Sequence, residues 1–129
     1  MLGCNGLIYP ISYDFNIQAH SQDEKVLSCN PDTIHKVNEI LSKIPVQYGY
    51  VYTKPDIGEC HDYTALCHKS DVDTAMFFFY KKFHIEIRGG IRKEETNLLG
   101  MDLLKALQNA FPNYRFEYKV ETKCLSILN

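Results

Sequence analysis

The chain has 129 residues, of which 45% are hydrophobic and 23% are charged, so it has the composition of a folded domain and not that of a disordered or collagen-like chain. At this length we expect a single domain, 1–129, with one hydrophobic core. Fourteen Lys and Arg residues against sixteen Asp and Glu residues give a formal net charge of -2, which excludes the broad cationic surface of non-specific nucleic-acid binders.

The sequence favours a soluble, cytoplasmic protein. The densest apolar run, 75–80, is far shorter than the roughly 20 residues of a membrane-spanning helix. We expect no secretory signal, because the first residues lack a basic segment followed by an apolar one. The five cysteines are odd in number and scattered, which favours reduced thiols over a disulfide framework.

Three elements are predicted in the first half of the chain. Apolar residues alternate with mostly polar ones over 7–17, which predicts a strand, and Pro10 allows only a sheet edge or a break there. An apolar stripe at helical spacing predicts a helix over 31–44, which Pro45 ends. Alternation resumes over 46–53, which predicts a second strand with its tyrosines on the apolar side.

The second half is predicted to begin with a long loop at about 54–73, and a loop of that length in a small domain is often functional. The longest predicted strand covers 74–88. A helix over 95–111 follows, and Gly100 lies on its apolar side, where a glycine lets the helix approach the sheet closely at a propensity cost of about 1 kcal/mol. A last strand is predicted over 114–120, with a short continuation at 124–128.

This order of elements predicts an α+β fold of the ferredoxin-like split βαβ type, with an antiparallel sheet of four to five strands and two helices on one face. Each predicted strand has one apolar and one polar side, so the second face of the sheet is expected to be open to water or to a partner. Tyr50 and Tyr118 are expected beneath the helices, whereas His84 and Arg115 are expected to point outward. The other residues expected on this polar face are Asp14, Lys82, Glu86, Arg88, Glu117 and Lys119.

The polar side of the sheet suggests one catalytic pair, His84 and Asp14. A carboxylate beside an imidazole is the minimum apparatus for general acid–base chemistry, because it orients the ring and stabilises its charged form. No residue is marked as a nucleophile, and the sequence has no G-x-S-x-G turn. Cross-strand charge pairs that keep an exposed sheet soluble explain the same residues, so we do not expect catalysis here.

The paired sequences Cys60-His61 and Cys67-His68 contain potential zinc ligands. On a helix, a spacing of seven residues would separate the pairs by about 10 Å, too far for one ion, and the usual spacing of two to four residues within a ligand pair is missing. We therefore expect no metal or other cofactor. If a metal does bind, His61, Cys67 and His68 are the candidate ligands.

A possible anion site lies at the turn over 88–93, which leads into a helix N-terminus where free N–H groups attract negative charge. Its spacing matches neither a P-loop nor a dinucleotide-binding fingerprint. Its candidate residues are Arg88, Gly89, Gly90, Arg92 and Lys93.

The first functional hypothesis is a small protein-binding module that inhibits or regulates a macromolecular partner by occlusion, as an immunity protein does. The partner would be another protein with a basic surface, recognised by the acidic residues of the predicted loop. Nucleic acid is not expected as a partner, because the strand aromatics share the apolar side, and a membrane is not expected either. The candidate partner-binding residues are Asp56, Glu59, Asp62, Asp71 and Asp73.

Two alternatives stay open. The first is a metal- or anion-dependent enzyme that acts on a phosphate-bearing substrate through His84, Asp14 and the turn over 88–93. The second is a structural subunit, and a homodimer formed through the last strand would favour it.

Overall fold

The computed structural model of the chain describes residues 8–20, 27, 31–53, 64–69, 73–78, 83–89 and 93–126. Its helices are α2 (Pro31–Lys43), the short 3-10 helix η1 (Pro45–Tyr48) and α3 (Lys93–Ala110). Its strands are β1 (Ile8–Ala19), β2 (Val51–Thr53), β3 (Thr64–His68), β4 (Asp73–Phe78), β5 (His84–Gly89) and β6 (Phe116–Ser126).

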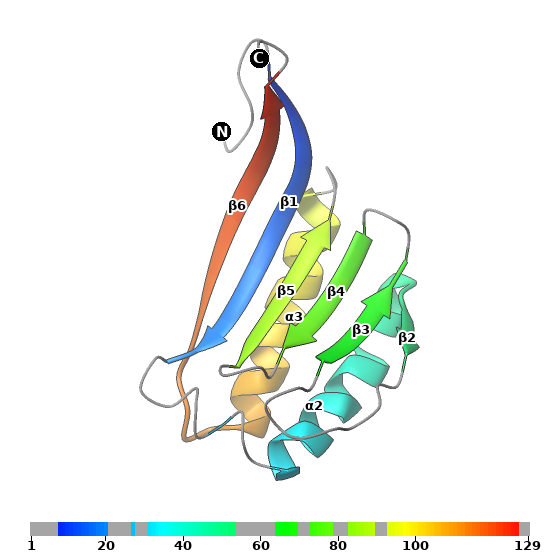
Figure 1. The fold of residues 1–129 in the computed structure, drawn as a ribbon. Coiled ribbons are helices and arrows are strands. Elements are labelled where there is room, and N and C mark those ends of the chain that lie inside the picture. The colour runs from blue at the N-terminus through cyan, green and yellow to red at the C-terminus, as the bar shows by residue number, and fades with distance from the viewer. Residues whose placement is uncertain are drawn as a thin grey trace.

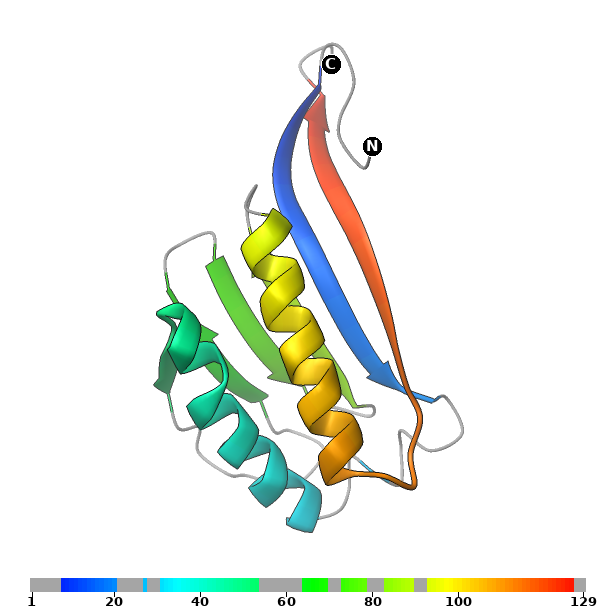
Figure 2. The same cartoon turned by 180° about the vertical axis from the view of Figure 1, so that it is seen from behind.

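The six strands form one sheet in the order β2-β3-β4-β5-β1-β6, and every neighbouring pair is antiparallel. Helices α2 and α3 lie on the same face of this sheet (Figures 1 and 2). No helix of the described residues lies on the opposite face, which we call the uncovered face. The predicted α+β class, the two helices and the antiparallel sheet are confirmed, but the sheet has six strands and not four to five.

The two extra strands come from segments that the sequence assigned differently. The predicted strand over 74–88 is two strands, β4 and β5, which pair with Asp73 opposite Gly89. Within the predicted loop over 54–73, Thr64–His68 is strand β3. Lys81 and Lys82 interrupt the apolar pattern between β4 and β5, and a hairpin lets both halves join one sheet.

The predicted strand over 46–53 was also partly wrong. Pro45 begins the 3-10 helix η1, because its fixed φ suits the first turn of a helix. Gly49 ends η1 with φ 90°, a left-handed conformation that favours glycine. The strand is therefore limited to Val51–Thr53, and Val46 is exposed, although its parity predicted burial.

The hydrophobic core lies between the helices and the sheet. Ile34, Val37 and Leu41 form the buried stripe of α2, as the helical spacing predicts. The largest fully buried side chains from the sheet and from α3 are Phe15, Ile17, Phe83, Ile85, Ile87, Leu99 and Leu103.

The predicted close approach at Gly100 is confirmed. A Cβ atom at this position would lie 2.5 Å from two ring atoms of Phe15 on β1. Glycine therefore sets how near α3 sits to the centre of the sheet.

Strand β6 is an edge strand, and this changes the predicted environment of one tyrosine. Tyr50 is 4% exposed, as expected, but Tyr118 is 52% exposed. The Tyr118 ring stacks on Phe15 with 5.1 Å between centroids, so it covers the border of the core without being enclosed by the helices. The apolar parity of β6 thus places Tyr118 on the correct face but does not predict its burial.

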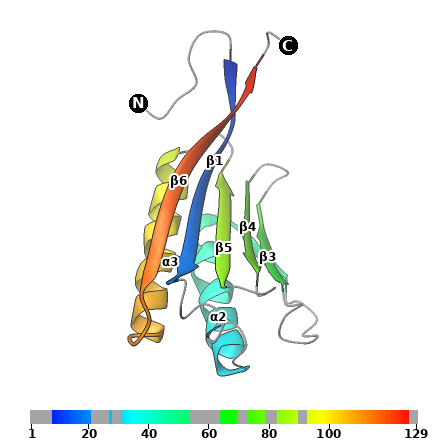
Figure 3. The ribbon, with the colours of Figure 1, turned by 60° about the vertical axis from the view of Figure 1, so that its left-hand side comes forward.

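Strands β1 and β6 form a long antiparallel pair that extends beyond the other strands (Figures 1 and 3). Their pairing shifts register between Pro10 and Ser12. Strand β5 pairs with β1 only from Asp14 to Gln18, so Pro10 lies where β1 has lost that neighbour. This position agrees with the expectation that Pro10 needs a sheet edge or a break.

Candidate functional site

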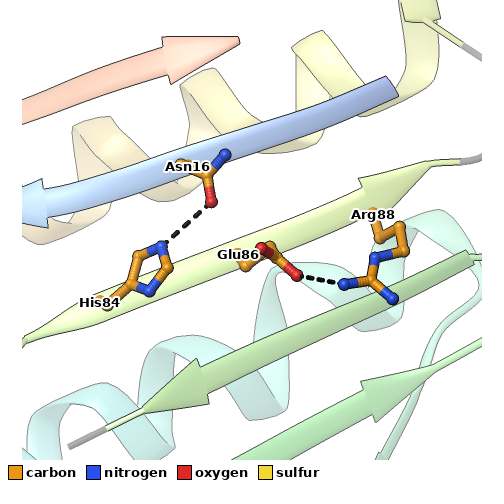
Figure 4. A network of polar contacts seen from close by, with 4 residues as sticks. All are labelled: Asn16, His84, Glu86 and Arg88. Carbon is orange, nitrogen blue, oxygen red and sulfur yellow. Dashed lines mark hydrogen bonds and ion pairs between the residues drawn. The ribbon is translucent and has the colours of Figure 1, made fainter. Parts of the chain in front are cut away.

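The uncovered face carries polar side chains from β5, β1 and β6 at its centre. His84 Nε2 lies 3.0 Å from Asn16 Oδ1 across the β5 and β1 pair (Figure 4). Along β5, Arg88 donates to Glu86 with 2.8 Å between the guanidinium nitrogen and the carboxylate oxygen (Figure 4). His84, Glu86 and Arg88 therefore lie on the face of the sheet that the sequence predicted for them.

The predicted catalytic pair is not formed. Asp14 lies opposite Arg88, whereas His84 lies opposite Gln18, four residues farther along β1. At about 3.3 Å per residue this separates the two positions by roughly 13 Å. The side chain of His84 contacts the amide of Asn16 and not the carboxylate of Asp14.

Asp14 differs from the prediction in a second way, because it is fully buried although its parity places it on the uncovered face. Its cross-strand neighbours are Arg88 on β5 and Glu121 on β6. A carboxylate with no exposed surface cannot exchange protons directly with a substrate in solution, so Asp14 does not serve the role given to it in the enzyme hypothesis.

The candidate anion-binding residues do not converge where they are described. Arg88 pairs with Glu86 on the uncovered face. Lys93 Nζ lies 6.0 Å from the ring centroid of Tyr13, whose side chain is on the helix-covered face. Gly89 packs against Thr96 of α3. Gly90 and Arg92 lie outside the described residues.

The candidate metal ligands Cys67 and His68 are adjacent in β3, so their side chains point to opposite faces of the sheet. Cys67 is fully buried, and its thiol donates to the carbonyl of Leu41 on α2 at 3.4 Å. Burial raises the pKa of Cys67 to about 12, so the thiol is protonated at neutral pH.

His68 is exposed, and His61 lies outside the described residues. Within the described part of the chain, no group of three or more His, Cys, Asp or Glu residues could hold a metal ion. Because Cys67 and His68 point to opposite faces of β3, these two side chains cannot hold one ion together.

The acidic partner-binding residues stay predictions. Asp56, Glu59, Asp62 and Asp71 lie outside the described residues. Asp73 is the first residue of β4, where it pairs with Gly89 of β5. Among the described residues, the candidate binding surface is formed by the strands of the uncovered face.

A hollow of about 290 Å³ lies on the uncovered face beside the His84 contact. It is lined by Asn16, Gln18, His84, Glu117, Tyr118, Lys119 and Glu121. The sequence predicted His84, Glu117 and Lys119 on the polar face but predicted no role for Asn16, Gln18 or Glu121. Their polar parity in β1 and β6 was the signal that could have found them.

A second hollow, of about 410 Å³, lies between α2 and β2. Tyr52 donates to Asn38 Oδ1 at 2.6 Å beside it, and His35 and Glu39 contribute exposed side chains. The Tyr52 hydroxyl mainly ties β2 to α2, since this hydrogen bond joins the edge of the sheet to the helix above it.

Comparison of the chain with protein-family models, curated proteins and solved structures finds no match. Among the described residues, no helix combines the length and apolar character needed to cross a bilayer. Function must therefore be inferred from the geometry of the uncovered face.

Proposed function

We propose that this protein is a small binding module that inhibits or regulates another protein by occluding it, in the manner of an immunity protein. One observation carries the proposal: α2 and α3 lie on a single face of the described six-stranded sheet (Figures 1 and 2), and the opposite face presents polar and charged side chains. A sheet face of this kind is a rigid, nearly continuous platform for a macromolecular partner.

The exposed side chains of the uncovered face suit protein recognition. Exposed charged or titratable residues spread over three strands, namely His68 on β3, Arg88 on β5 and Glu117, Lys119 and Glu121 on β6. Val51 at the β2 edge of this face is 67% exposed. An apolar or aromatic residue at the border of a polar surface is a common anchor in interfaces, and the charges set association rate and specificity.

A basic partner surface fits this face best. Arg88 is paired with Glu86, so these two charges cancel. The exposed charged residues of β6 are two acidic ones, Glu117 and Glu121, and one basic one, Lys119. The acidic residues proposed for the loop, Asp56, Glu59, Asp62, Asp71 and Asp73, would add to the same charge. A cytoplasmic location remains part of this proposal, since it rests on the cysteine pattern.

We also propose a ferredoxin-like relationship for the fold. Strands β6, β1, β5 and β2 follow one another across the sheet in the order of a split βαβ sandwich, with the β3 and β4 hairpin inserted between β5 and β2. This order supports the relationship, and the insertion would widen the uncovered face.

The enzyme alternative has less support than binding. Its acid–base pair would need Asp14 beside His84, and the described residues do not offer that arrangement. Of its possible metal ligands, His68 is exposed on β3 and His61 lies outside the described residues.

Affinity capture from the native host, read by mass spectrometry, tests the proposal. Gln18→Arg with His68→Arg adds positive charge to the uncovered face, and Leu98→Arg with Met101→Arg adds the same charge to the exposed side of α3. We expect the natural chain and the α3 variant to retain a stoichiometric protein partner, and the uncovered-face variant to lose it. Absence of any such partner, or loss only in the α3 variant, would refute the proposal.

A further inference from the structure

Strand β6 is the last strand of the described sheet. It spans 11 residues, Phe116–Ser126, and pairs with β1 along its inner side. As the last strand of the sheet order it has no described neighbour on its outer side. A long edge strand is a template for pairing with another chain, because its outward N–H and C=O groups are available.

The charges on β6 alternate in sign along the uncovered face. Glu117, Lys119 and Glu121 are all exposed and occupy successive positions of the same parity, opposite Gln18, Asn16 and Asp14 of β1. Lys123 occupies the next position of this parity and continues the alternation in the sequence. Charged side chains protect natural edge strands against pairing with unrelated strands, whereas charges that alternate in sign can complement those of a second copy of the same strand.

We propose that β6 pairs antiparallel with β6 of a second copy of this chain, about a two-fold axis at Val120, so that the two sheets become one continuous sheet. In this register Lys119 lies opposite Glu121 of the second copy, and the symmetry repeats the pair. Glu117 lies opposite the position of Lys123. Opposite charges directly across an antiparallel pair are stabilising.

The charge pattern selects the register. An axis at Lys119 would place Glu117 opposite Glu121, and an axis at Glu121 would place Lys119 opposite Lys123, so both registers bring like charges together. An axis at Tyr118 restores opposite charges but aligns only 116–120 of the strand with itself. The axis at Val120 aligns 116–124 and gives four opposite-charge contacts, counting both copies. An axis at Thr122 aligns 118–126, a ladder of the same length, but gives only two, because Lys119 would lie opposite Leu125.

The other face of β6 agrees with this arrangement. Tyr118 is 52% exposed, although its ring already stacks on Phe15 at the border of the core. In the proposed register Tyr118 lies opposite Thr122 of the second copy, and the new strand would cover the exposed side of the ring. The contact explains why a large aromatic residue is left at the edge.

Sedimentation velocity over a range of protein concentration and salt tests this dimer. The natural chain should sediment as a species of twice 14.9 kDa, and Lys119→Glu should raise the dimer dissociation constant at least about tenfold, because it places two like-charge pairs at the interface. The double variant Lys119→Glu with Glu121→Lys restores opposite charges and should restore the dimer. A monomer at all concentrations, or a dimer indifferent to Lys119→Glu, would overturn the proposal.

Disulfide trapping tests the register and uses the same symmetry. In a chain whose Cys4, Cys29, Cys60 and Cys124 are replaced by serine, Val120→Cys should form an intermolecular disulfide, because residues at a two-fold axis face each other. Thr122→Cys is the matched control and should not cross-link to itself, since it would face Tyr118. Cross-linking of Thr122→Cys alone would overturn the register.

This dimer and the proposed binding function are separated by different measurements. Lys119→Glu changes both the uncovered face and the β6 edge, whereas Gln18→Arg with His68→Arg leaves every residue of β6 unchanged. Loss of the dimer with retained partner capture would refute only the dimer, and the reverse result would refute only the binding function.

Discussion

Replacement of Gly100 by alanine tests whether α3 is held against the sheet at the distance that the structure gives. The new Cβ would lie 2.5 to 2.6 Å from three ring atoms of Phe15. Carbon atoms in contact prefer about 3.5–4.0 Å, so the ring or the helix must move by about 1 Å. Phe15 is almost fully buried, and a buried ring has little room to move.

Two effects of opposite sign compete in Gly100→Ala. Alanine improves helix propensity by about 1 kcal/mol. Overpacking of a well-filled core costs about 1–3 kcal/mol, and the short contacts place this site toward the upper part of that range. We therefore expect a net loss of about 1–2 kcal/mol in the free energy of unfolding.

Urea unfolding followed by circular dichroism measures this loss. With a slope of about 2 kcal/mol/M in urea, which is typical of a small protein, the midpoint should fall by roughly 0.5–1 M. Met101→Ala, at an exposed neighbouring position of α3, is the control and should change stability by less than about 0.5 kcal/mol. An increase in stability of Gly100→Ala by the full propensity gain would refute the close contact with Phe15.

Three further predictions follow from single side chains. With the other cysteines replaced by serine, Cys67, whose pKa burial raises to about 12, should react with a thiol reagent at pH 8 only after unfolding, and rapid labelling of the folded protein would contradict its burial. The pKa of Tyr48 is raised to about 12, mainly because its hydroxyl donates to Asp102 at 2.5 Å. This hydrogen bond stabilises the fold below the ordinary pKa of about 10, and the stabilisation is lost as the pH rises toward 12. Tyr48→Phe should therefore lower the free energy of unfolding by about 0.5–1 kcal/mol at pH 8 and leave it unchanged near pH 12. A difference in urea midpoint that does not depend on pH would contradict this. Tyr13→Phe removes a hydrogen bond of 2.9 Å to Asn97 that ties β1 to α3, and should cost about 0.5–1.5 kcal/mol in the same assay, whereas an unchanged midpoint would mean that this bond does not stabilise the fold.

The sequence predicted the elements whose periodicity extends over many residues. Both helices and the buried parity of β5 follow from residues such as Val37, Leu103 and Ile85, which recur at regular spacing and are all buried. It failed where periodicity covers few residues. The strand β3 has five residues among polar neighbours, and η1 depends on Pro45 and the left-handed Gly49, which interrupt an apparently continuous alternation.

The sequence predicts on which face of the sheet a side chain lies, but it does not predict which residues that side chain contacts. Parity correctly placed His84 and Arg88 on the uncovered face, but it cannot give the register between strands that are distant in sequence. Register decides that His84 contacts Asn16 and lies far from Asp14. Parity also cannot report how far a helix extends over a sheet, which is why the exposure of Tyr118 was missed.

Site-specific photo-cross-linking in the native host tests the central claim most directly, because it asks which face of the sheet contacts a partner. A photoreactive residue at His68, exposed on the uncovered face, is compared with one at Leu98, exposed on α3. We expect a discrete adduct of the chain with one other protein from position 68 and none from position 98. An adduct from position 98 alone would show that the partner binds the helices and would contradict binding by the uncovered face.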